Sequence, residues 1–244
     1  MKRALVLVVA LFAGSVTLFT QTKAPVAPGV SPERIARIDA RLQQYIDDGK
    51  VAGAVARVLR DGQVIYERAF GWSDKEAGRR MTTDAIFRIA SQSKAITSAA
   101  AMMLVEEGKI GLDDPVSRFI PAFAKTTVSV RKDGVVSIVP ANRPITIKQL
   151  LSHTAGMSYG TGRDVAALYE AKGLGPAAGL GWYTADKDEP ICQTMERLAA
   201  LPMAAQPGEA YVYGYSLDVL GCVIERASGI PLDQFIKTRI TDPL

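Results

Sequence analysis

The sequence predicts a mixed α/β (α+β) protein in which antiparallel strands are flanked by helices and accompanied by a helical region. A Ser-Pro-Glu start and apolar residues at helical spacing predict a helix over residues 31–48. Residues 54–59 and 64–70 surround an Asp-Gly pair and are typical of a β-hairpin with a tight turn. A second Asp-Gly pair predicts another hairpin from residues 127–131 and 135–139.

Further helices are expected in the second half of the chain. Residues 91–107 are rich in Ala and Met and are followed by Gly108, which is typical of a helix that ends at a glycine. Shorter helical patterns begin at Thr146, at Ser216 and near Leu232. Residues 160–190 are glycine-rich and have no clear period, so no element is predicted there.

Composition is that of an ordinary globular protein. The chain has 244 residues, of which 48% are hydrophobic and 22% charged, and this length suits one large domain or two small ones. The net charge of +4 is small and no dense Lys/Arg stripe occurs, which argues against nucleic acid as a partner. Two cysteines and one histidine disfavour a zinc site, and we expect no metal and no cofactor.

The N-terminus resembles an export signal. A Lys-Arg start followed by an apolar stretch over residues 4–19 predicts a signal peptide at residues 1–24, a tether at 25–30 and a domain at 31–244. The alternative is an uncleaved membrane anchor, whereas cleavage predicts a periplasmic or secreted protein without stable membrane insertion. Cys192 and Cys222 could pair after export, but the apolar helical pattern around Cys222 favours a buried free cysteine.

Two Ser-x-x-Lys motifs are present, and local structure separates them. Ser129 lies in a predicted strand, where residues three apart point to opposite faces. Ser91 begins a predicted helix, where Lys94 shares its face and the positive helix start favours developing negative charge. Only Ser91 therefore has the expected geometry of an activated nucleophile; the alternative is that it merely caps its helix.

Several segments in order resemble the penicillin-binding-protein and β-lactamase superfamily. They are residues 87–94 (FRIASQSK), 108–116 (GKIGLDDPV), 150–156 (LLSHTAG), 207–216 (PGEAYVYGYS), 218–221 (DVLG) and 228–229 (SG). The resemblance covers about residues 31–244. Within the superfamily, the chain resembles class C β-lactamases and family VIII esterases. It implies a β-lactamase/transpeptidase-like fold, Ser91 as the acylated nucleophile, and Lys94, with a lowered pKa, and Tyr213 as proton-handling groups.

The sequence departs from the family pattern at two places. Tyr215 stands where class C β-lactamases have Asn, which is more similar to the family's esterases and puts β-lactam hydrolysis in doubt. With Gln92, Tyr215 is the expected substrate-binding residue. The family's third motif, Lys-Thr-Gly or His-x-Gly, does not occur before Leu244. We therefore expect a domain that stops before the closing strands of its sheet and, as a fragment, is inactive.

The resemblance implies a hydrolase of small esters or amides, with a small-molecule ester, amide or β-lactam as its partner and an oligomeric state left open. The alternatives are a non-catalytic relative and a D-Ala carboxypeptidase or β-lactamase of the same fold. His153, the single histidine, could suggest a Ser-His-Asp triad, but no Gly-x-Ser-x-Gly elbow exists, and we expect a structural turn residue. Tyr159, Trp182 and Tyr183 fit either a substrate pocket or simple packing.

Overall fold

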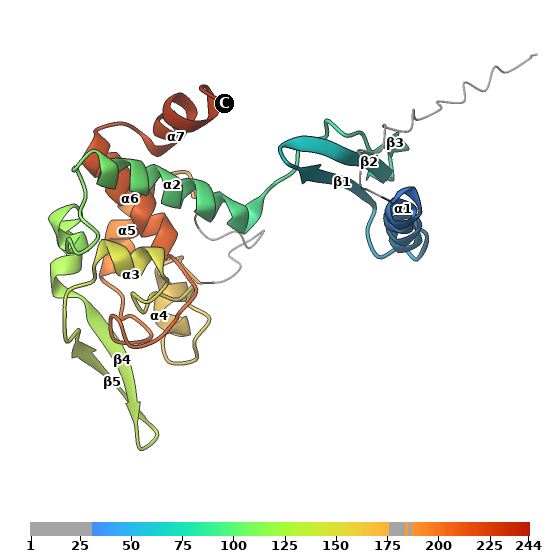
Figure 1. Cartoon of the computed structure of the whole chain (residues 1–244). Coiled ribbons are helices and arrows are strands. Elements are labelled where there is room, and N and C mark those ends of the chain that lie inside the picture. The colour runs from blue at the N-terminus through green and yellow to red at the C-terminus, as the bar shows by residue number, and fades with distance from the viewer. Residues whose placement is uncertain (1–30, 176–183, 185–186) are drawn as a thin grey trace, which may run out of the picture. The chain divides into compact units, whose positions relative to one another are not determined.

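The computed structural model describes residues 31–175, 184 and 187–244 and divides the chain into two compact units, at residues 1–88 and 89–244 (Figure 1). The signal peptide and tether expected at residues 1–30, and the candidates Trp182 and Tyr183, lie outside the described residues. A single domain over residues 31–244 stays a prediction, and each unit is described by itself.

The first unit is a helix and a three-stranded antiparallel sheet. Its elements are α1 (Pro32–Asp47), β1 (Gly53–Arg60), β2 (Gln63–Asp74) and β3 (Arg79–Arg80), in the sheet order β1-β2-β3. The predicted helix and hairpin are confirmed. The Ser31 side chain caps α1 by accepting from the Arg34 N–H at 3.4 Å, and Asp61 and Gly62 turn between the strands with φ of 50° and 75°, as a two-residue hairpin requires.

Helix α1 is tied to β2 by one carboxylate. Asp39 accepts a hydrogen bond from the Tyr66 hydroxyl and another from the Arg68 guanidinium, each at 2.6 Å. Tyr66 is buried, and the ion pair between Arg68 and Asp39 is half-buried. This cluster fixes the register of the helix against the strand.

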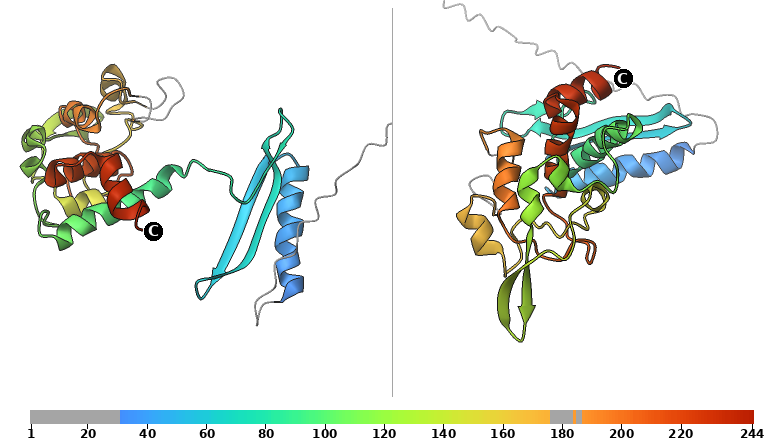
Figure 2. Two further views of the ribbon diagram at one scale, coloured as in Figure 1. Left: turned by 90° about the horizontal axis from the view of Figure 1, so that it is seen from above. Right: turned by 90° about the vertical axis from the view of Figure 1, so that its left-hand side faces the viewer.

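The second unit is mainly helical (Figure 1). Its elements are the 3₁₀ turn η1 (Ala90–Gln92), α2 (Ser93–Glu106), the 3₁₀ turns η2 (Val116–Arg118) and η3 (Pro121–Lys125), β4 (Thr127–Lys132), β5 (Val135–Pro140), α3 (Ile147–Leu151), α4 (Ala166–Ala171), α5 (Ile191–Ala199), α6 (Ser216–Ser228), α7 (Leu232–Ile236) and the π-helical turn η5 (Lys237–Thr241). The hairpin of β4 and β5 is confirmed and projects from the helices of this unit (Figure 2). Helices α4 and α5 were not predicted. Helix α4 is short and lies in glycine-rich surroundings, which leave little periodicity. Helix α5 does have buried residues at helical spacing, Cys192, Met195, Leu198 and Ala199, and this signal was missed.

Helix α6 is the centre of this unit. It packs against α2, α3, α5 and α7. Its residues from Ser216 to Ile224 are buried with the exception of Asp218, which is half-buried. The helix ends at Gly229, whose φ of 73° is the left-handed conformation that glycine adopts readily. A continuous apolar core therefore surrounds the helix that follows the Tyr213 segment.

Helix α5 is held to α6 by a disulfide between Cys192 and Cys222. The expectation of a free buried cysteine is therefore wrong; an apolar helical pattern does not exclude a partner that arrives from another helix. At the start of α5, Glu189 accepts hydrogen bonds from Arg197, one of them at 3.0 Å, and from the Thr194 hydroxyl at 2.6 Å. The Arg197 and Thr194 hydrogen bonds hold the pKa of Glu189 at about 2.

Within the part of the chain that the structure describes, no helix is long and apolar enough to cross a membrane.

Candidate functional site

Ser91 lies at the junction of η1 and α2. The predicted helix over residues 91–107 is present, but its α-helical part begins two residues later, and Ser91 occupies the preceding 3₁₀ turn. Ala90 has a φ of 45°, which is unfavourable for a residue with a side chain. Such strain is tolerated where the surrounding structure enforces it, and it concentrates at functional sites.

Lys94 lies one turn after Ser91 on the same face, as the Ser-x-x-Lys spacing predicted. Its ammonium Nζ donates a hydrogen bond to Ser91 Oγ at 3.2 Å. The second Ser-x-x-Lys motif lies on β4, as predicted, and Ser129 Oγ is buried without a hydrogen-bond partner among the described residues. Only the first motif therefore joins a serine to its lysine.

Tyr213 reaches the same serine from a segment far away in the sequence. Its hydroxyl donates a hydrogen bond to Ser91 Oγ at 2.7 Å. Tyr213 precedes the first residue of α6 by three positions, just as Ser91 precedes α2 by two. Because α2 packs against α6, the starts of both helices meet at this point, and their positive ends favour an anion there.

The segment before Tyr213 is fixed by backbone contacts. The N–H groups of Ala204, Gly208 and Val212 donate to carbonyls of residues 153–156, each at 2.8 Å. Gly214 follows Tyr213, and a Cβ there would lie 2.3 Å from the Met157 carbonyl oxygen. Only glycine therefore allows the two chain segments to approach this closely.

The electrostatics of Lys94 and Tyr213 are coupled, with 4.9 Å between Lys94 Nζ and the Tyr213 ring centroid. The hydrogen bond with Ser91 and the nearby Lys94 charge lower the pKa of Tyr213, although burial acts in the opposite direction. Burial lowers the pKa of Lys94, but interactions with Tyr213 and Tyr159 outweigh it, so this pKa is raised. The expected lowered pKa of Lys94 is thus wrong: two phenols around the amine stabilise its charged form.

The two expected substrate-binding residues are placed differently. Gln92 is exposed beside Ser91, in a position open to solvent. Tyr215 is fully buried, its ring packs edge-on against Tyr159 at 4.9 Å, and its hydroxyl donates to the Leu174 carbonyl at 2.8 Å. In this structure Tyr215 therefore supports the interior next to the site and does not face an open pocket.

Sequence reasoning gave little weight to three neighbours of this serine. Tyr159 hydrogen-bonds Lys94, and His153 packs against Tyr213 with ring centroids 4.7 Å apart. Burial raises the pKa of Asp218, whose carboxylate accepts the Thr184 hydroxyl at 2.8 Å. Tyr159 and His153 lie in loops, whose packing residue spacing does not encode, while Asp218 lies in the first turn of α6.

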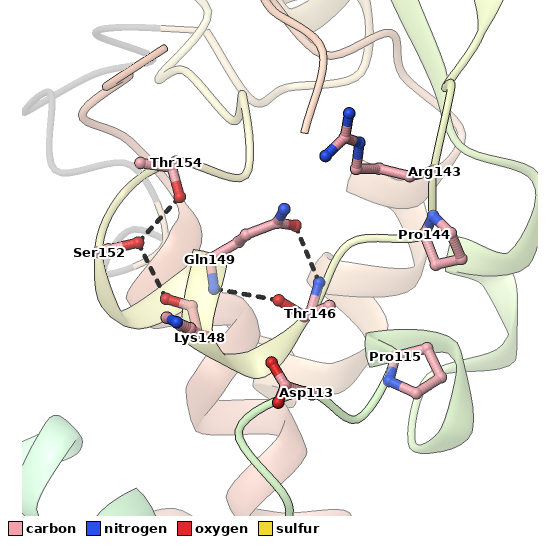
Figure 3. Close-up of a pocket in the computed structure, with 9 residues that line it drawn as sticks. All are labelled: Asp113, Pro115, Arg143, Pro144, Thr146, Lys148, Gln149, Ser152 and Thr154. Carbon is pink, nitrogen blue, oxygen red and sulfur yellow. Dashed lines mark hydrogen bonds between the residues drawn. The ribbon is translucent and has the colours of Figure 1, made fainter. Parts of the chain in front are cut away.

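A separate pocket of about 570 Å³ lies beside the start of α3 (Figure 3). Ser91, Lys94 and Tyr213 do not line it. Thr146 and Gln149 exchange side-chain and backbone hydrogen bonds there and cap α3, while Ser152 Oγ lies 2.8 Å from Thr154 Oγ1. The side chains of Thr146, Gln149, Ser152 and Thr154 are thus hydrogen-bonded within the fold. Among the described residues, no group of three or more His, Cys, Asp or Glu side chains is arranged to hold a metal ion.

Comparisons with known proteins identify the family of the chain. The model of the Beta-lactamase family matches residues 38–244. Esterase EstB of Burkholderia gladioli is 36% identical over 209 residues, which are 86% of this chain and 49% of EstB. Lovastatin esterase of Penicillium rubens is 32% identical, over 85% of this chain and 50% of that protein.

Among solved structures, EstCE1, described as a hydrolase with promiscuous acyltransferase activity, matches with a TM-score of 0.72 and 34% identity, covering 86% of this chain and 51% of EstCE1. The chain spans about half the length of the curated relatives that it matches. The chain belongs to the β-lactamase family, and its fold is β-lactamase/transpeptidase-like. The resemblance to this family of serine hydrolases is confirmed.

Proposed function

We propose that this chain belongs to an exported serine hydrolase that cleaves small esters or amides through an acyl-enzyme on Ser91. The observation that carries the proposal is the pair of hydrogen bonds on Ser91 Oγ, from Lys94 at 3.2 Å and from Tyr213 at 2.7 Å. A hydroxyl with a base and a cation in reach is the arrangement of an activated nucleophile. The esterase names of its relatives support the reaction class.

Tyr213 is the general base in this mechanism. In its phenolate form, favoured by its lowered pKa, it takes the proton of Ser91 Oγ while that oxygen attacks the substrate carbonyl. Lys94 stays protonated, because its pKa is raised, and its charge stabilises the phenolate and the alkoxide. Tyr213 then gives the proton to the leaving alcohol or amine, and the acyl-enzyme forms.

Deacylation repeats the proton transfers with water. Tyr213 accepts a proton from the attacking water, the tetrahedral adduct collapses, and Ser91 Oγ recovers the proton as the acid leaves. The backbone N–H of Ser91, at the start of a helix, is one expected donor to the oxyanion in both steps. No histidine is required for these steps.

The substrate is proposed to be a small ester rather than a β-lactam. Tyr215 stands where class C β-lactamases have Asn, and its hydroxyl is engaged with the Leu174 carbonyl, so it offers no amide to a β-lactam side chain. Gln92, exposed next to Ser91, is the proposed contact for the substrate's polar groups. The printed description of EstCE1 as a hydrolase and acyltransferase supports transfer of simple acyl groups.

A periplasmic or secreted location is proposed from two observations. Residues 1–24 have the pattern of a signal peptide. The disulfide between Cys192 and Cys222 is of a kind that persists in oxidising compartments outside the cytosol.

The test is to find which serine is acylated. The purified protein, in its full-length form, is treated with a fluorophosphonate, and the labelled peptide is identified by mass spectrometry; label is expected at Ser91 and absent in Ser91→Ala. Ser129→Ala is the matched control, since it removes the serine of the second Ser-x-x-Lys motif. Label at Ser129, or no label on native protein, would contradict the proposal, the latter favouring a non-catalytic relative.

Turnover then separates the reaction classes within the fold. The value of kcat/KM for a short-chain p-nitrophenyl ester is expected to exceed that for nitrocefin or for a D-Ala-D-Ala peptide. A higher value for nitrocefin would assign a β-lactamase, and a higher value for the peptide a carboxypeptidase.

A further inference from the structure

The Tyr213 ring depends on its neighbours for its position. The residue is 42% exposed, so part of its surface has no protein neighbour to hold it in place. The imidazole of His153 lies against it with ring centroids 4.7 Å apart and planes tilted by 38°. Tyr159 meets it edge-on at 5.8 Å. Since a phenol rotates easily about χ1 on an open surface, these rings limit its freedom.

His153 is itself held firmly. Only 8% of the residue is exposed, and its φ of 55° is the left-handed conformation that few side-chain-bearing residues adopt. Its N–H donates to the Leu150 carbonyl at 3.2 Å, and its carbonyl accepts from the Val212 N–H at 2.8 Å. Val212 is the residue immediately before Tyr213. His153 thus contacts the Tyr213 segment through both its backbone and its ring.

His153 is neutral near pH 7, which allows its ring to pack in a buried position. Burial, and then the positive charge of Lys94, lower its pKa, so the imidazole is neutral near pH 7. Its Nδ1 is buried without a hydrogen-bond partner in the part of the chain that the structure describes. A buried N–H donor without a partner is rarer than a buried acceptor without one, which favours the tautomer protonated at Nε2.

We propose that His153 is a positioning residue: its neutral ring holds Tyr213 within hydrogen-bonding reach of Ser91, and it takes no part in proton transfer. The inference rests on the proposed role of Tyr213 as the base. This role differs from that of a triad histidine, which would transfer protons, and from that of a turn residue, which needs only the positive φ of His153. The contact with Tyr213 is made by the imidazole ring.

Two substitutions separate ring from backbone. His153→Asn keeps a residue that tolerates positive φ but removes the ring, whereas His153→Phe keeps a ring and strains the backbone. Positioning by the ring predicts that the Phe variant retains kcat within about threefold, while the Asn variant loses about tenfold or more with KM little changed. A backbone role alone predicts the reverse order, and a role as base predicts that both variants are inactive; either result would overturn the proposal.

A double-mutant cycle tests whether the effect passes through Tyr213. In the Tyr213→Phe background, His153→Asn is expected to change the residual kcat by less than about twofold, because the base that it positions is already gone. An equal loss in both backgrounds would exclude the proposed path. If Tyr213→Phe alone keeps full activity, the proposed function fails; if it is inactive and only the order of the His153 variants is reversed, this inference alone fails.

The unmodified protein provides a test that does not depend on the folding of these variants. With one histidine in the chain, a ¹⁵N-histidine-labelled sample without a histidine tag gives a single imidazole. A neutral ring protonated at Nε2 near pH 7, whose carbon-bound ring protons shift when Tyr213 is changed to Leu, is the expected result. An imidazolium, a ring protonated at Nδ1, or ring-proton shifts unchanged by Tyr213→Leu would overturn the inference.

Discussion

Substitution of Gly214 by Ala tests how closely Tyr213 must be placed. The new Cβ would lie 2.3 Å from the Met157 carbonyl oxygen and 2.5 Å from the Ser158 carbonyl carbon. Both are backbone atoms, so relief to an ordinary contact requires a displacement of about 1 Å of one chain segment. Tyr213 is the adjacent residue, and its hydrogen bond to Ser91 is 2.7 Å long. A displacement of this size takes the bond beyond about 3.5 Å, where it ceases to be one.

The expected loss in kcat for a p-nitrophenyl ester is on the order of 10²-fold, which corresponds to about 2.7 kcal/mol in the activation free energy. The free energy of unfolding is expected to fall by about 1–3 kcal/mol, since the site becomes overpacked. Gly162→Ala is the matched control, because the nearest neighbour of a Cβ there is a Val165 methyl at an ordinary 3.6 Å. The assay compares kcat and thermal unfolding for both variants. A Gly214→Ala protein that folds and keeps kcat within about twofold of the native value would refute the reasoning.

Other predictions concern the roles of Tyr213 and Lys94, the disulfide and the ion pair of Glu189. Tyr213→Phe and Lys94→Ala should each lower kcat/KM about 10²-fold or more in steady-state assays. Because the proposed base form of Tyr213 is deprotonated, kcat/KM should rise with pH through a pKa below the ordinary value of about 10, and Lys94→Ala should move this inflection upward. Replacing Cys192 and Cys222 by Ser opens a cross-link between residues 30 apart and should lower the free energy of unfolding in urea by about 3–4 kcal/mol. Glu189, whose pKa is lowered to about 2, contributes stability that is present above its unfolded pKa of about 4.3 and is lost as pH falls towards 2; Glu189→Gln should therefore make the thermal midpoint less sensitive to acid over this range.

Local patterns predicted the local structure well. Both Asp-Gly hairpins, the helix that follows Ser31 and the helix that begins at Ser216 are present, because turn residues, caps and helical spacing act over a few positions. The proximity of Ser91 and Lys94 was predicted for the same reason: a helix brings residues three apart to one face. The 3₁₀ turn that contains Ser91 was not predicted, since the exact ends of helices depend on tertiary contacts.

Contacts between distant segments were beyond such patterns. The hydrogen bond from Tyr213 to Ser91 joins residues 122 apart, and only the order of family motifs suggested it. The raised pKa of Lys94 depends on Tyr159, which a loop brings close and which no spacing rule identifies. The inward orientation of Tyr215 likewise depends on the carbonyl of Leu174. The sequence therefore predicted the residues that meet at Ser91 Oγ, but not the neighbouring groups that change their pKa values.

The packing distance between α2 and α6 sets how far apart Ser91 and Tyr213 lie. Ser91 and Tyr213 stand at the starts of α2 and α6, and the buried face of α2 is formed by Ala100, Ala101 and Leu104. Adding a methyl group to either alanine is expected to push the helices apart and to change the distance between Ser91 Oγ and the Tyr213 hydroxyl, at a point away from both residues. In a laboratory evolution experiment, selection for altered turnover should consequently enrich conservative volume changes in this buried face as well as substitutions around the open site.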